Sequence, residues 1–448
     1  MSRLWDKGEP LDQVIERFTV GRDPELDLRL VHYDALSSAA HATMLCEIEI
    51  LTEADKQQLI AELKLISEEA LKGEFPITRS DEDGHTAIEN RLTERLGDVG
   101  RRIHTGRSRN DQVIAAIRLY GREMVLKQYA ALLTLVDALL LLADKEAETS
   151  IPGYTHTRQA MPSTLGFLFA AHAENLLDDI PWLENAFGHI NRSPLGSASG
   201  FGVSLPLDRA RVCSLLAFDS LQLNTIAVQN DRGKTESLVL GAAAAPALDL
   251  SRLAGDLVWY SSDELNFMTL HNRVTTGSSI MPQKRNPDVL ELIRASAQRI
   301  RSRQAEISAV YSPLSSGYHR DLQLTKEPFL EGMQLAVDCL QAMLPVLESL
   351  TINADSCRQA MNRAIGATDE VYRRVAEGTP FRSAYQEIAA DPIGTVKGDP
   401  ADAWRQRTHL GAPGALDLSG YRERVARAKS WLDVQGQKIE TAWSLFSD

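Results

Sequence analysis

Hydrophobic residues recur along most of this chain with the period of an α-helix, and no long stretch alternates in the way a half-buried strand would. From about Asp111 onward the helical pattern becomes long. Pro162 suits a first helical turn, and Pro181 would kink the helix that contains it. We predict five long helices, and hence a central bundle, over residues 112–148, 162–189, 234–266, 288–311 and 321–349.

Shorter helical patterns flank the expected bundle. Residues 34–50 carry an apolar stripe of alanine and leucine, and residues 53–71 continue the helical period. After Asn353 the segments are short and are separated by glycine- and proline-rich turns. We therefore predict an all-α fold with three helical domains, namely an N-terminal helical domain over residues 1–110, the long-helix bundle over 111–353 and a small C-terminal helical domain over 354–448.

Some of the long helices are apolar on more than one face. The run Leu132-Leu133-Thr134-Leu135-Val136 is an example. A helix of this kind needs packing partners all round. We expect several copies of the chain to associate, so that their bundles form a common multi-helix core.

Composition and charge narrow the class of protein. Of the 448 residues, 24% are charged and 44% are hydrophobic, which is ordinary for a globular protein of two or three domains. The formal net charge of -13 argues against general binding to nucleic acid or to an anionic membrane. The first residues carry no apolar signal region, and the four cysteines form no Cys-x-x-Cys pair. We expect a cytoplasmic protein.

The sequence carries no signature of a metal or a nucleotide cofactor. No two histidines stand at the spacing of helical metal ligands, and there is no His-Glu-x-x-His motif. A dinucleotide loop and a phosphate loop are also missing. We therefore predict no metal and no cofactor.

The segment from Gly277 to Asp288 reads as a candidate catalytic loop, with the sequence G-S-S-I-M-P-Q-K-R-N-P-D. It carries two hydroxyls, a lysine and an asparagine, and a helical pattern begins directly after it. A lysine near a helix N-terminus suits developing negative charge. Taken alone, glycine and serine beside proline are more often a plain surface loop.

Three further strings carry polar side chains suited to a ligand with several carboxylates. They are H-T-G-R-S-R-N-D-Q-V from His104, P-G-Y-T-H-T-R-Q-A-M-P from Pro152, and G-Y-H-R-D-L-Q-L-T-K-E from Gly317. Arginine offers a planar donor fork to a carboxylate, and histidine titrates near neutral pH. Each string alone also has a plain structural reading: a basic capping turn, a structural histidine and a solvated helix start.

Together the four strings resemble the argininosuccinate lyases of the fumarase/aspartase superfamily. The loop is similar to G-S-S-x-M-P-x-K-x-N-P of that superfamily, and Gln283 after Met-Pro is the residue usual in argininosuccinate lyases. The resemblance implies reversible anti-elimination of argininosuccinate to L-arginine and fumarate, a step of arginine biosynthesis that needs no cofactor. It also implies a homotetramer in which each active site is built from the loops of three subunits.

The resemblance further implies roles for individual residues. Ser278 matches the position usually taken as the general base, and His156, oriented by Glu291, would donate a proton to the departing nitrogen. Histidine has the better intrinsic pKa, so the sequence leaves open which of the two is the base. Lys284 and Asn286 would stabilise the carbanion. The residues left to hold the substrate are Ser108, Arg109, Asn110, Thr155, Tyr318, Gln323 and Lys326.

At several places the chain departs from the family pattern. Asp23 stands where these lyases usually have a substrate-binding serine, Gly84 replaces Ile or Val, and Gly233 replaces Asp. Gln159 comes one position later than usual. Two alternatives remain: another fumarate-releasing lyase of the superfamily, such as an adenylosuccinate lyase, or a structural protein of the crystallin kind without activity.

Overall fold

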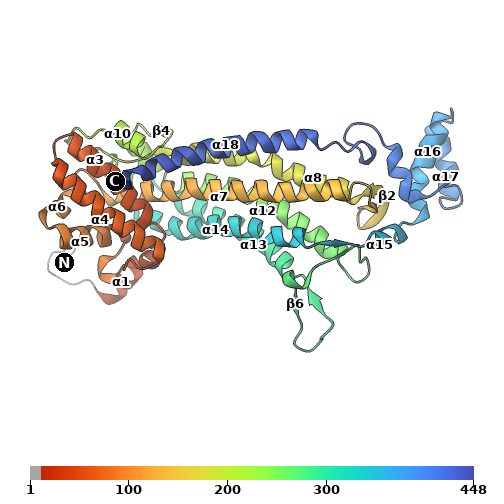
Figure 1. Cartoon of the computed structure of the whole chain (residues 1–448), viewed down its shortest axis with the longest axis horizontal. Coiled ribbons are helices and arrows are strands. Elements are labelled where there is room, and N and C mark those ends of the chain that lie inside the picture. The colour runs from red at the N-terminus through yellow and green to blue at the C-terminus, as the bar shows by residue number, and fades with distance from the viewer. Residues whose placement is uncertain (1–11, 448) are drawn as a thin grey trace.

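Long helices run along most of the molecule in the computed structural model, which describes residues 12–447 (Figure 1). Helix α13 has the bounds predicted from the sequence, and α7 and α12 lie close to theirs. The prediction of an all-α fold is confirmed. The long helices are α7 (Arg109–Lys145), α12 (Lys234–Tyr260), α13 (Asp288–Tyr311), α14 (Lys326–Glu348) and α18 (Ser419–Trp443).

The bundle is held together by contiguous apolar packing. Helix α12 packs against α13, α13 against α14, and α14 against α7. Leu132, Leu135 and Val136 of α7 are wholly buried. Each fully buried side chain of this size contributes roughly 1.5–3 kcal/mol. By length and composition α7 and α12 could cross a membrane, but 61% and 50% of their most apolar windows are buried inside the molecule.

One predicted helix has a different structure. Residues 162–189 were expected to form a single helix, but Pro162 lies in strand β2 (Arg158–Thr164), which pairs with β1 (Ser150–Thr155) as an antiparallel hairpin. The Thr164 side chain then caps helix α8 (Leu165–Asp178) by accepting from the backbone N–H of Phe167. Helix α9 (Ile180–Ile190) follows, with Pro181 in its first turn, where a proline is tolerated.

Helix α18 was not predicted as a part of the bundle. It follows the small helices α16 (Ala367–Ala376) and α17 (Phe381–Ala390), which lie at the right-hand end of Figure 1, and runs back along the molecule. It packs against α7 and α8. At its end Trp443 stacks on His32, with ring centroids 4.1 Å apart. The predicted limits of the three domains stay a prediction, but residues 419–443 pack with the bundle.

Helices of the N-terminal part cover the other end of the bundle. They are α3 (Val31–Glu47), α4 (Glu53–Lys72) and α5 (Gly84–Leu96), and α3 packs against both α4 and α7. Short helices complete the fold: α1 (Gln13–Val20), α2 (Asp23–Asp27), α6 (Asp98–Arg101), α10 (Arg209–Leu215), α11 (Thr225–Asn230), α15 (Ala354–Gln359) and the 3₁₀ helix η4 (Arg320–Thr325). The two-residue strands are β3 (Arg192–Ser193), β4 (Ser220–Leu221), β5 (Met268–Thr269), β6 (Thr276–Gly277), β7 (Arg285–Asn286) and β8 (Thr351–Ile352).

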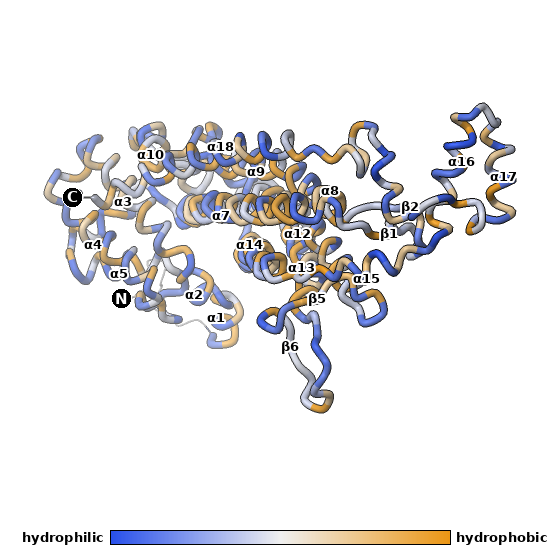
Figure 2. The backbone as a smooth tube through the Cα atoms, turned by 45° about the vertical axis from the view of Figure 1, so that its right-hand side comes forward, coloured by the Kyte–Doolittle hydropathy of each residue, from blue (hydrophilic) through white to orange (hydrophobic). Residues whose placement is uncertain are grey.

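The candidate catalytic loop connects β6 with β7 and projects from the middle of the bundle (Figures 1 and 2). Its tip is apolar, since Ile280 is 82% exposed and Met281 is 37% exposed. The apolar side chain of Ile280 is thus largely open to solvent at the end of the loop.

Candidate functional site

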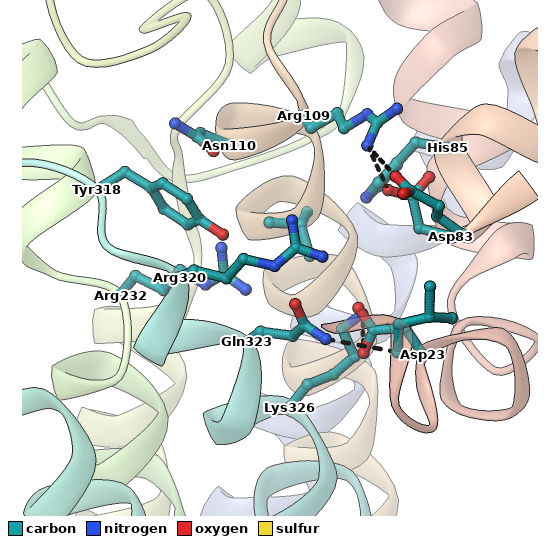
Figure 3. A pocket seen from close by; sticks show the side chains of 13 residues that line it. Asp23, Asp83, His85, Arg109, Asn110, Arg232, Tyr318, Arg320, Gln323 and Lys326 are labelled. Atoms are coloured by element: carbon teal, nitrogen blue, oxygen red, sulfur yellow. Dashed lines mark hydrogen bonds and ion pairs between the residues drawn. The ribbon is translucent and has the colours of Figure 1, made fainter. Parts of the chain in front are cut away.

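A cleft where the bundle meets the N-terminal helices gathers five of the predicted site residues (Figure 3). Arg109 and Asn110 begin helix α7, Tyr318 and Gln323 lie before and within η4, and Lys326 is the first residue of α14. Segments more than 200 residues apart in sequence thus present their polar side chains to one cavity. Its lining is Val20, Asp23, Glu82, Asp83, His85, Arg109, Asn110, Val113, Arg232, Tyr318, Arg320, Gln323 and Lys326.

Lys326 is held on the wall of this cleft by two carboxylates. Its Nζ lies 2.5 Å from Asp27 Oδ1 and 3.2 Å from Asp23 Oδ1. Burial acts to lower the pKa of Lys326, but the charges of Asp27 and Asp23 outweigh it and raise that pKa above its ordinary value. The lysine is therefore a permanent cation whose charge is already balanced inside the protein.

Asp23, the residue that departs from the family's serine, is therefore a partner of Lys326. Its own pKa is raised, because burial disfavours the carboxylate more than the lysine favours it.

Gly84 contacts Asp27, the other carboxylate that holds Lys326. Its backbone N–H donates to Asp27 Oδ2 at 2.9 Å, and a Cβ on Gly84 would meet the Cβ of Asp27 at 3.1 Å. A larger residue at position 84 would press on the carboxylate that holds Lys326.

The start of α7 is fixed by capping. Ser108 Oγ accepts from the backbone N–H of Asn110, while the Asp111 carboxylate accepts from the backbone N–H of Ser108. Asp111 also accepts from the N–H groups of Gly196 and Ala198, and burial raises its pKa to about 6. The Ser108 hydroxyl, predicted to bind substrate, is thus a helix cap in this chain.

Two other predicted substrate ligands in the cleft also have protein partners. Arg109 Nη1 lies 3.2 Å from Glu82 and 3.3 Å from Asp83. Gln323 Nε2 donates to the carbonyl oxygen of Thr19 at 3.0 Å. These contacts orient both side chains along the cleft wall.

The sequence interpretation missed two buried cations of the cleft. His85 Nδ1 lies 2.5 Å from Asp34 Oδ2; burial opposes the charged imidazole, but the Asp34 carboxylate outweighs it and raises the pKa of His85 to about 9. Arg232 is 4% exposed and its guanidinium lies 5.4 Å from the centre of the Tyr318 ring. Each lies next to a glycine, Gly84 or Gly233, at which the sequence departs from the family pattern. The departure drew attention to the glycine and not to the neighbouring cation.

His156 and Thr155 lie elsewhere, on the β1–β2 hairpin. His156 and Thr157 form its two-residue turn with φ of 54° and 59°, a conformation that suits the tight hairpin but is unusual for a β-branched residue such as Thr157. The His156 side chain is exposed at the tip. The shifted Gln159 anchors the hairpin, since it donates to the carbonyl of Ala360 and accepts from the N–H of Asn362.

The β6–β7 loop carries the third group of predicted residues, Ser278, Lys284 and Asn286. The backbone N–H groups of Ile280 and Met281 point at Ser278 Oγ, at 3.3 and 3.1 Å. Two such donors stabilise negative charge on the serine oxygen. Lys284 is exposed, and Glu291 is exposed in the first turn of α13.

A single chain does not bring together the cleft residues, the His156 hairpin and the β6–β7 loop. Helix α7 has 37 residues and is about 55 Å long at 1.5 Å per residue; Asn110 begins it, and the hairpin with His156 follows its far end. The β6–β7 loop, which carries Ser278, projects from the side of the bundle between them (Figure 1). In the part of the chain that the structure describes, no group of three or more His, Cys, Asp or Glu residues could hold a metal ion.

Comparison with known proteins identifies the family. A family model described as "Lyase" matches residues 8–302. The argininosuccinate lyase of Sorangium cellulosum is 43% identical over 425 residues, which cover 95% of this chain and 99% of that protein. The chain belongs to the argininosuccinate lyase family. Another member of that family, from Bacteroides thetaiotaomicron, is 44% identical over 87% of each chain.

Solved structures extend the likeness to the fold. An EDDS lyase in complex with formate superposes with a TM-score of 0.81 at 24% identity, covering 98% of this chain and 95% of that one. A class II fumarase from Schistosoma mansoni gives a TM-score of 0.72 at 16% identity, covering 88% and 96%. The long-helix architecture of this argininosuccinate lyase family member is thus shared with other lyases.

Proposed function

We propose that this chain cleaves argininosuccinate reversibly into L-arginine and fumarate by anti-elimination, as a carbon–nitrogen lyase of arginine biosynthesis. Curated argininosuccinate lyases at 43–44% identity over most of the chain support this activity. The observation that carries the proposal is the polar cleft, in which Asn110, Tyr318, Gln323 and Lys326 come together from distant segments. A substrate with three carboxylates and an ammonium needs such a set of anchors.

In the proposed mechanism Ser278 removes a proton from the carbon next to a carboxylate of the succinyl group. A serine hydroxyl is a weak base unless its alkoxide is stabilised. The N–H groups of Ile280 and Met281 supply that stabilisation at Ser278 Oγ. The pair of electrons left on carbon spreads into the adjacent carboxylate, where Lys284 and Asn286 would offset the additional charge.

The carbon–nitrogen bond then breaks, and the electrons of the carbanion form the double bond of fumarate. His156, with Glu291 as its orienting partner, would donate a proton to the departing guanidino nitrogen. The turn that carries His156 presents it at the tip of a short hairpin, which suits insertion into a site formed elsewhere. Thr155 on the same hairpin would bind a carboxylate, together with Asn110, Arg109 and Ser108 from the start of α7.

The arrangement also leads us to propose a homotetramer with shared active sites. The cleft, the β6–β7 loop and the hairpin are distributed over the length of one molecule, so a complete site requires several chains. Large apolar side chains on the long helices are exposed in the isolated chain: Leu141 by 70%, Leu238 by 50% and Leu292 by 66%. Bundles packed side by side would cover them. Light scattering that finds a fully active monomer would disprove this arrangement.

The activity is tested by incubating purified protein with argininosuccinate and recording the ultraviolet absorbance of fumarate. We expect fumarate release that depends on enzyme concentration and that is absent with adenylosuccinate. Release from adenylosuccinate alone would replace the proposal with the adenylosuccinate lyase reaction. No release from either substrate at saturation would reject a lyase role. A cytoplasmic location is proposed with this metabolic role.

A further inference from the structure

The β1–β2 hairpin, which carries His156 at its tip, is held in place by other parts of the chain. A two-stranded hairpin is marginally stable at best on its own, so its neighbours decide where its tip lies. Tyr154 packs on helix α12, with its ring edge-on to that of Trp259 and the two centroids 4.7 Å apart. Further contacts come from residues 360–407, a segment that includes helices α16 and α17 beside the hairpin (Figure 2).

Two contacts with this segment hold the base of the hairpin, which is the end away from the turn. Trp404 Nε1 donates to Ser150 Oγ at 2.9 Å, and both side chains are buried. Arg407 donates to the carbonyl oxygen of Pro162, and its Nη2 lies 2.9 and 2.8 Å from the two carboxylate oxygens of Asp369. The base is therefore fixed on both strands, at positions well separated from the turn.

Gln159 anchors the hairpin close to its tip. It lies opposite Tyr154 in the ladder, one pair away from the residues that adjoin the turn. Its side-chain Nε2 donates to the carbonyl oxygen of Ala360 at 2.6 Å, and its Oε1 accepts from the backbone N–H of Asn362 at 2.9 Å. The amide is thus bound at both its donor and its acceptor, which fixes its position and its rotation against the end of α15.

A β-bulge lies beside this anchor. The ladder shifts register between Gly153 and Tyr154, because β2 has one residue more there than β1. A bulge of this kind bends the strand and re-aims the residues beyond it, which here are Thr155 and His156. Gln159, which comes one position later than the glutamine of the family pattern, is the first residue of β2 on the tip side of the bulge. It therefore holds the part of the hairpin that the bulge re-aims.

We infer that Gln159 is a positioning residue, which fixes the hairpin tip against the end of α15 and thereby orients His156 for proton transfer. This inference rests on the proposed function for the task of His156. Proton transfer depends steeply on geometry, since a displacement of about 1 Å at a reacting group can lower a rate by roughly a hundredfold. Binding of the substrate depends less on the hairpin, because Thr155 is only one of several proposed anchors. Loss of Gln159 will therefore act mainly on kcat.

The test is a double-mutant comparison of steady-state kinetics with argininosuccinate. Q159A loses both hydrogen bonds and will lower kcat by roughly ten- to hundredfold, while KM rises by no more than about threefold. Q159E keeps the shape and the acceptor for the N–H of Asn362 but loses the donor to Ala360, so its kcat will fall between. Added to H156N, Q159A will lower kcat no further, because the group that it positions is missing. Q386A, at an exposed glutamine of α17, will behave as wild type.

Hydrogen exchange of the backbone amides measures the anchor without reference to activity. Q159A will speed exchange in residues 154–159 and leave exchange in the bundle helices unchanged. Three kinetic results overturn the inference: wild-type kcat in Q159A, equal losses in the wild-type and H156N backgrounds, or an H156N protein as active as wild type. Unchanged exchange at the hairpin tip also overturns it. If wild type releases no fumarate, the proposed function is rejected, and the exchange result alone then supports or overturns Gln159 as the anchor of the tip.

Discussion

The ammonium of Lys326 lies 2.5 Å from the carboxylate of Asp27, and only 2% and 3% of these side chains are exposed. Asp27 also accepts from the backbone N–H of Gly84, so one carboxylate joins helices α2, α5 and α14. Lys326 lines the cleft, and Asp27 lies behind its lining. Removing one member of a buried ion pair leaves the other charge uncompensated, which is far more costly than losing a surface pair.

We expect Asp27→Asn to lower the free energy of unfolding by about 3 kcal/mol, since Asp23 remains as a second partner of Lys326. This change in the free energy of unfolding is measured by urea denaturation at one fixed protein concentration. Glu25→Gln on the same helix is the control, because the Glu25 side chain is 70% exposed and its loss should change little. An Asp27→Asn protein as stable as this control would show that the buried pair contributes nothing.

The contact between His85 and Asp34 predicts a pH dependence of stability. The pKa of His85 is about 9 in the folded protein, above its ordinary value near 6.5, so folding favours the protonated form. This stabilisation, on the order of 3 kcal/mol, is complete below about pH 6.5 and is lost as pH rises toward 9. Melting temperatures across that range will fall in wild type and less steeply in His85→Gln. His409→Gln, at an exposed histidine, should keep the wild-type slope.

Ser278 and Ser279 are neighbours, but only the oxygen of Ser278 faces two backbone donors. We expect Ser278→Ala to lower kcat by roughly 10²- to 10⁴-fold with a small change in KM, as for loss of a general base. Ser279→Ala should keep most of the activity. If Ser278→Ala turned over at a near-native rate while His156→Asn did not, the roles of base and acid would be exchanged. Asparagine is suitable at position 156 because it tolerates the positive φ of the turn.

Shared active sites predict complementation between inactive variants. Ser278→Ala and His156→Asn proteins, each inactive alone, should regain activity when they are dissociated together and reassembled. Mixed oligomers would then contain sites with an intact Ser278 from one chain and an intact His156 from another. Continued inactivity of well-folded mixed oligomers would place both residues of a site on one chain.

The success of the sequence interpretation differed between elements for physical reasons. Helix α13 was located to the residue, because a strong apolar period follows the proline at position 287. Helix α18 was missed as a bundle helix, because the residues it buries, such as Val425, Ala428 and Ile439, are few and lie among many charged residues. So sparse an apolar face gives only a weak periodic signal. The hairpin with His156 was missed because its strands do not alternate cleanly.

The residues of the candidate site also differ in whether the local sequence could reveal them. Local strings marked Asn110, Tyr318, Gln323 and Lys326, and the fold brings these together in one cleft. The pairing of Asp23 with Lys326 and the position of the buried Arg232 beside the Tyr318 ring depend on contacts between residues far apart in sequence, so no string could reveal them. The roles of Ser278, His156, Lys284 and Glu291 remain predictions.

Product balance is the most direct measurement of the proposed reaction. Purified protein is supplied with argininosuccinate, and L-arginine and fumarate are quantified by chromatography over time, beside the Ser278→Ala variant. Elimination predicts equal amounts of L-arginine and fumarate from wild type and almost none from the variant. Arginine without fumarate, or neither product at saturating substrate, would contradict the proposal.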